Sequence, residues 1–108
     1  MVKKLTPTQV VALLANFFLR NGYVRRIDAV RRTEEGQLYK KGAEIRLVAE
    51  TEDELKLIRQ LLIQAGFKVA EPFVKANQWR QPIYGVGEVA RFLSLIEWIE
   101  KKRNSAVE

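Results

Sequence analysis

The chain has 108 residues, 47% of them hydrophobic, and it contains neither cysteine nor histidine. This composition supplies one buried core, and it excludes disulfides, zinc sites with thiolate or imidazole ligands, and catalysis by a cysteine nucleophile or a histidine base. No signal peptide is recognisable, so the expected location is cytoplasmic.

The first predicted helix runs to about Asn21. Thr6 can cap it, Pro7 suits the first helical position, and Gln9 completes a capping box three residues after the cap. Gly22 provides the stop signal. The opening of the chain therefore predicts a helix with well-defined ends.

This helix is apolar on every side, because Asn16 is the one polar residue between Val10 and Leu19. The run is too short to cross a bilayer, so no membrane partner is expected. A helix lying on a sheet needs only one apolar stripe. A second copy of the chain, paired about a twofold axis, is therefore expected to cover the rest. The alternative is a central helix wrapped by its own chain.

The next elements are two strands. Residues 23–32 interleave β-branched and aromatic residues with arginine, which predicts a strand, and residues 33–41 form a turn-bearing connection. Residues 43–50 alternate strictly, which predicts a strand with one buried face. Its two faces carry Ile45, Leu47 and Ala49 on one side and Glu44, Arg46 and Val48 on the other.

The second half of the chain repeats this plan. Thr51 and Glu54 predict another capping box, and the helix that follows stops at Gly66. Two strands are expected near 67–71 and 77–84, then a last helix over about 87–102. Residues 104–108 are expected to be a disordered tail.

The order of elements is α-β-β-α-β-β-α, which predicts an α+β fold. A single αββαββα unit over residues 1–103 would form a four-stranded antiparallel sheet with its helices on one face. Basic residues concentrate in its first half: Arg20 to Arg46 includes eight basic and four acidic residues. This pattern suits a polyanion-binding face and a solvated charged surface about equally.

The end of the first helix, residues 14–24, reads LANFFLRNGYV. It resembles the LAGLIDADG motif of homing endonucleases at Leu14, Ala15, Phe17, Phe18, Gly22, Tyr23 and Val24. Residues 79–85 and 88–93 resemble the family's last strand running into a helix with a Val-x-x-Phe-Leu face. The resemblance covers nearly the whole chain, through the order and spacing of its elements.

The resemblance implies a dimer whose paired first helices lie at a twofold axis, above a sheet that curves over DNA. The implied dimer interface comprises Ala12, Ala15, Asn16 and Leu19. Asn16 stands where the family's motif has a small glycine, and it is expected to hydrogen-bond to its twin across the axis.

The family's acidic residues at the base of these helices hold divalent metal ions for phosphodiester hydrolysis. Asn21 takes the place of the essential aspartate, and Leu19 the place of an earlier one. A neutral amide coordinates magnesium weakly and brings no charge. No catalytic residue, metal site or cofactor is therefore expected, and magnesium matters only if cleavage is retained.

The resemblance also implies that strand side chains on the open face of the sheet enter the DNA major groove. By alternation, the expected nucleic-acid-binding residues are Tyr23, Arg25, Arg31, Lys40, Lys41, Glu44, Arg46, Lys68 and Arg80. Lys40 and Lys41 suit phosphate contacts. A bulge after Arg25 would shift the register of the first strand by one residue.

The leading hypothesis is a homodimer that binds a specific, near-palindromic duplex DNA site without cutting it. One alternative is an active metal-dependent homing endonuclease whose acids come from elsewhere in the chain. Another is an RNA-binding domain that uses the same sheet. The remaining alternative is a basic dimer with no nucleic-acid role.

Overall fold

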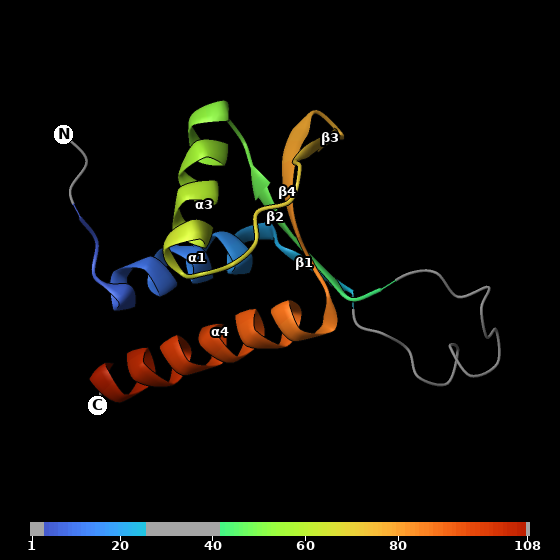
Figure 1. Cartoon of the computed structure of the whole chain (residues 1–108). Coiled ribbons are helices and arrows are strands. Elements are labelled where there is room, and N and C mark those ends of the chain that lie inside the picture. The colour runs from blue at the N-terminus through green and yellow to red at the C-terminus, as the bar shows by residue number, and fades with distance from the viewer. Residues whose placement is uncertain (1–3, 26–41, 108) are drawn as a thin grey trace, which may run out of the picture.

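A computed structural model of the chain describes residues 4–25 and 42–107. In these residues, an antiparallel sheet is covered on one face by helices, which confirms the α+β fold (Figure 1). The elements are α1 (Pro7–Asn21), β1 (Tyr23–Arg25), β2 (Glu44–Ala49), α3 (Glu52–Gln64), β3 (Phe73–Lys75), β4 (Gln78–Tyr84) and α4 (Val86–Val107).

The capping box predicted for α1 is confirmed. The backbone N–H of Gln9 donates to the Thr6 hydroxyl over 3.2 Å, and the Thr6 N–H donates to the Gln9 side chain over 2.9 Å. Gly22 ends the helix in an extended conformation, with its N–H bonded to the carbonyl of Phe18. A Cβ at Gly22 would lie 2.6 Å from that carbonyl oxygen, so glycine is required there for space and not for a left-handed turn.

The strands lie in the order β1-β2-β4-β3, and every neighbouring pair is antiparallel. Ile45 and Leu47 of β2 point toward the helices and are fully buried, as their alternation predicts. Ile83 of β4 pairs with Ile45 on the same face. The core therefore lies between this face and the helices α1, α3 and α4, which all contact β2.

The strand expected over residues 67–71 is absent, and the strand of this hairpin is β3, residues 73–75. Phe67 packs edge-on against Phe92 in the core. The carbonyl of Ala70 accepts hydrogen bonds from the side chains of Arg59 and Gln81, at 3.0 and 2.8 Å. These side chains therefore satisfy a backbone carbonyl that would accept a hydrogen bond from a neighbouring strand if this segment were part of the sheet. Gln81, which is fully buried, also accepts from Arg59 at 2.7 Å.

The helix α4 extends beyond its expected end. It continues through residues 104–107, where the sequence predicted a disordered tail. Arg103, one turn before the end, donates from Nη2 to the carbonyl of Ala12 and to the Asn16 side chain of α1, at 3.1 and 2.9 Å. This contact anchors the C-terminal half of α4 to α1.

Candidate nucleic-acid interface

The open face of the sheet, opposite the helices, carries every charged side chain of the four strands. The strand register places Tyr23 beside Arg46, and it places Glu44 between Arg25 and Tyr84. Four cations, Arg25, Arg46, Lys75 and Arg80, share this face with one carboxylate, Glu44. The face is therefore positively charged overall, whereas the side that meets the helices carries no charge.

Glu44 is the centre of an ion-pair cluster on this face. Its side chain is only 3% exposed. One carboxylate oxygen accepts from Nη2 of Arg25 at 2.7 Å, and the other accepts from Nε of Arg46. Glu44 is predicted to bind nucleic acid, and that stays a prediction; in the structure its two oxygens accept from these arginines. The carboxylate thus bonds to both arginines at once.

Arg46 lies between aromatic rings. Its guanidinium carbon is 5.3 Å from the ring centre of Tyr23 and 5.2 Å from that of Phe73. Such contacts favour a cation over the ring faces. The hydrogen bond that Arg46 donates to Glu44, with the charge of that carboxylate, raises the pKa of Arg46 above its usual value. Arg46 is thus a permanent cation with a confined orientation.

The other cations on this face are held less tightly. Arg80 makes one long hydrogen bond, 3.4 Å from Nη2 to the side chain of Gln78, and its buried Nε has no partner among the described residues. Lys75 is exposed. Tyr23 and Tyr84 leave 44% and 53% of their surfaces exposed. The face therefore presents cations together with accessible aromatic rings.

The structure does not place several of the predicted DNA-binding residues on this face. Lys68 is exposed, but it lies in the segment between α3 and β3 and not in a strand, so the basis of its assignment is wrong. Arg31, Lys40 and Lys41 lie outside the described residues, as does the register of the first strand after Arg25.

The predicted set omits four polar, charged or aromatic residues of this face. Gln78 and Tyr84 follow the same alternation as Arg80, so that pattern could have identified them. Phe73 and Lys75 were missed because β3 was expected several residues earlier.

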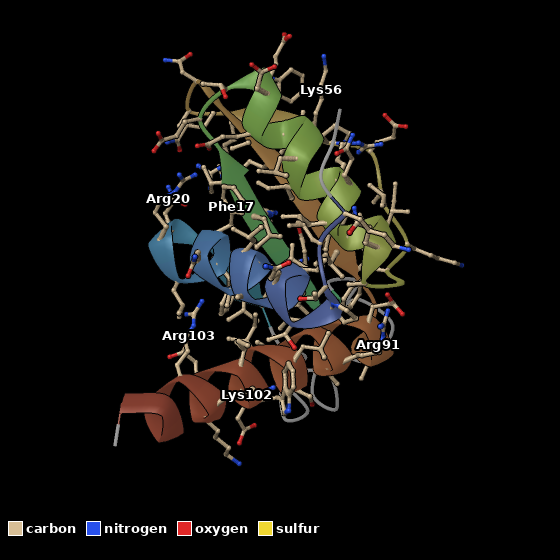
Figure 2. All side chains as sticks on the ribbon, turned by 90° about the vertical axis from the view of Figure 1, so that its left-hand side faces the viewer. Phe17, Arg20, Lys56, Arg91, Lys102 and Arg103 are labelled. Atoms are coloured by element: carbon tan, nitrogen blue, oxygen red, sulfur yellow. The ribbon has the colours of Figure 1, made fainter. Side chains whose placement is uncertain are left out.

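The end of α1, where the resemblance places the metal site, contains Asn21, which is exposed. The neighbouring Arg20 lies at the edge of the molecule (Figure 2), where it donates to the carbonyl of Val48 at 3.0 Å and to Glu54 at 2.9 Å. In the described ranges, no three acidic side chains gather closely enough to hold a metal ion.

The expected dimer surface on α1 is largely occupied by the chain itself. Ala15 is fully buried in the core, so it is corrected from an interface residue to a core residue. Asn16 bonds to Arg103 of its own chain, and Arg103 reaches toward α1 from α4 (Figure 2). The alternative of a helix wrapped by its own chain therefore describes α1 better than an uncovered one. Leu19 remains 56% exposed, and Ala12 is half-buried.

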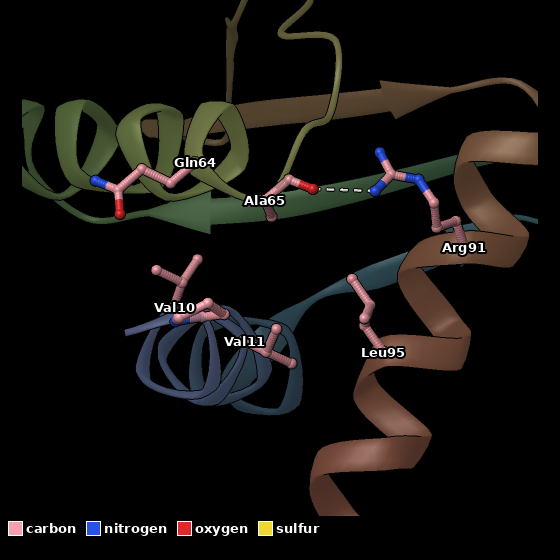
Figure 3. Close-up of a pocket in the computed structure, with 7 residues that line it drawn as sticks. Val10, Val11, Gln64, Ala65, Arg91 and Leu95 are labelled. Atoms are coloured by element: carbon pink, nitrogen blue, oxygen red, sulfur yellow. Dashed lines mark hydrogen bonds between the residues drawn. The ribbon is translucent and has the colours of Figure 1, made fainter. Parts of the chain in front are cut away.

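A pocket of about 230 Å³ opens between α1, α3 and α4, on the helical side of the molecule (Figure 3). Its walls are mainly apolar, and include Val10, Val11 and Leu95. Its cation, Arg91, donates to the carbonyls of Ala65 and Gly66, at 3.0 and 2.7 Å. Arg91 thus caps the end of α3, and the pocket offers no nucleophile or carboxylate for chemistry.

Within the described residues, no helix combines the length and apolar character needed to cross a bilayer. Comparisons of the chain with family models, curated proteins and solved structures found no match. The assignment of the open face as the candidate site therefore rests on its own side chains.

Proposed function

We propose that the protein binds duplex DNA on the open face of its sheet, as a LAGLIDADG-like domain without the family's cleavage chemistry. The observation that carries the proposal is the gathering of Arg25, Arg46, Lys75 and Arg80 on the face of the sheet opposite the helices. Lysine and arginine neutralise phosphates, and arginine also forms paired hydrogen bonds with base edges in the major groove.

The test is a salt-dependent binding measurement. We expect a labelled duplex to bind with an affinity that falls steeply as salt rises, because each phosphate contact releases counterions. Arg80→Gln should lower both the affinity and the salt slope. Lys56→Gln makes the same charge change on α3, on the helical side, and should leave both unchanged (Figure 2). Equal losses in the two variants would contradict binding by the open face.

Binding without cleavage is proposed because Asn21 supplies a neutral amide where the LAGLIDADG motif has a carboxylate. Purified protein should therefore leave duplex DNA uncut when magnesium is present. Nicking that depends on magnesium and is lost in Asn21→Ala would support the active endonuclease instead.

A homodimer through α1 forms part of the proposal, and it rests on the resemblance and on the exposure of Leu19. Ala12 and Asn16 lie on the same side of the helix but accept hydrogen bonds from Arg103 of their own chain, so the proposed contact is centred on Leu19. Pairing two sheets about a twofold axis would match a near-palindromic site, because the symmetry of the protein and of the site then agree.

A second candidate function is the binding of single-stranded or structured RNA. The exposed rings of Tyr23 and Tyr84 on the open face favour it, because unpaired bases stack on aromatic side chains. Competition between duplex DNA and structured RNA for the same protein separates the candidates. If RNA displaces duplex DNA from the protein more effectively than DNA displaces RNA, and Tyr84→Ala reduces this preference, RNA binding becomes the favoured function.

A further inference from the structure

Arg46 differs from the other cations of the open face in how completely its orientation is restricted. Glu44 holds its Nε, while Tyr23 and Phe73 lie within 5.3 and 5.2 Å of its guanidinium carbon. The side chain is 21% exposed, so it is mostly enclosed by its neighbours. These contacts already restrict the rotamers of Arg46 in the unbound protein. Binding therefore costs less side-chain entropy than it would for a flexible arginine.

The contacts also show which edge of the guanidinium the described residues leave without a hydrogen bond. Nε is used by Glu44, and among the described residues no hydrogen bond engages Nη1 or Nη2. Two donors side by side on a planar group match two adjacent acceptors. In the major groove, the O6 and N7 atoms of guanine form such a pair.

We infer that Arg46 is a specificity-determining residue that reads one guanine in each half of the bound duplex, and that Glu44 is its positioning residue. This inference rests on the proposed binding of duplex DNA by the open face. Glu44 contacts no base. It fixes the plane of the arginine fork and shares its charge with Arg25, at 2.7 Å from Nη2 of that side chain.

The experiment is selection of bound sequences from a randomised duplex pool, with wild-type protein and four variants whose folding is checked by thermal melting. Wild type should return a site with one dominant guanine in each half. Arg46→Lys keeps the charge but loses the fork, and should reduce the preference for that guanine by about tenfold. Arg46→Gln should shift the same position toward adenine, whose N6 and N7 atoms match an amide.

The two remaining variants distinguish recognition of a base from electrostatic attraction to the DNA. Glu44→Gln should weaken the preference at the same position and leave the other positions unchanged, because it loosens Arg46 without removing it. Lys75→Gln, on the same face, should lower affinity and leave the selected sequence unchanged, because it contributes charge alone.

The outcomes distinguish this inference from the function on which it rests. A specific site that all variants select equally would overturn the reading role of Arg46, while DNA binding would stand. Arg46 would then be a structural partner of Glu44. Failure of folded wild-type protein to enrich any sequence would overturn both the guanine contact and the proposed sequence-specific binding.

Discussion

Gly22 is needed because of a close approach to the backbone of its own helix. A Cβ there would lie 2.6 Å from the Phe18 carbonyl oxygen and 2.7 Å from Cδ1 of its ring. Gly22→Ala should therefore lower the free energy of unfolding by about 1–3 kcal/mol, the usual cost of overpacking. Urea denaturation measures this.

The matched control is Gly42→Ala, where an added Cβ would meet nothing within 4 Å. Its effect should stay within about 0.5 kcal/mol, as for an ordinary surface substitution. Equal effects of the two substitutions would show that Gly22 is not sterically required.

Glu54 links the stability of the fold to pH. The hydrogen bond from Arg20, followed by the backbone N–H of Glu50, lowers the pKa of Glu54 below its ordinary value of 4.5. Because the folded state has the lower pKa, this stabilisation is complete above about pH 4.5 and is lost as pH falls through the folded value. Glu54→Gln should therefore cost up to about 1 kcal/mol at pH 7, and the cost should shrink in acid.

The measurement is urea denaturation of both proteins at pH 7 and below the pKa of Glu54. Glu97→Gln is the control, because the ion pair of Glu97 with Lys101 is largely exposed and should contribute little. A loss in Glu54→Gln that is the same at both pH values would contradict the linkage.

At the scale of elements, the hairpin of β3 and β4 turns on Ala76 and Asn77, which both have positive φ angles of 52° and 61°. Two such residues make a tight two-residue turn, in which asparagine and glycine are preferred. Alanine in this conformation is strained. Ala76→Asn should raise the free energy of unfolding by about 0.5–1 kcal/mol, whereas Ala76→Val should lower it. Thermal melting of both variants measures these effects. An increase in the stability of Ala76→Val would show that the turn is not strained.

The helices and the central strands could be predicted because their signals are local. Thr6 and Gln9 lie three residues apart, and the alternation around Ile45 and Leu47 needs only neighbouring residues. That alternation also placed Arg46 on the open face. The position of β3 could not be predicted, because Phe67 mimics a strand residue while packing against Phe92.

The hydrogen bonds in and around the candidate site could not be predicted from the sequence, because they join residues that are far apart along the chain. Gln81 accepts a hydrogen bond from Arg59 on α3, and Arg103 donates one to Asn16 on α1. Spacing along the chain carries no information about such pairs. For the same reason the ion pair of Glu44 with Arg25 could not be predicted.

At the scale of the whole molecule, the proposed dimer can be tested at Leu19, which is 56% exposed on α1. Leu19→Glu would bury a charge in that interface and should weaken association at least about tenfold, measured by analytical ultracentrifugation. Ile63→Glu places the same charge on α3, at a site 63% exposed, and should leave the dimer intact. A monomeric wild-type protein at micromolar concentration would contradict the dimer.

The most direct test of the open face as a DNA-binding surface is NMR chemical-shift mapping of the intact protein during titration with duplex DNA. We predict that the largest shifts fall on β2 and β4, around Arg46, Arg80 and Tyr84, and that residues such as Lys56 on α3 stay unperturbed. Shifts confined to the helices, or none at DNA concentrations well above that of the protein, would contradict the proposal.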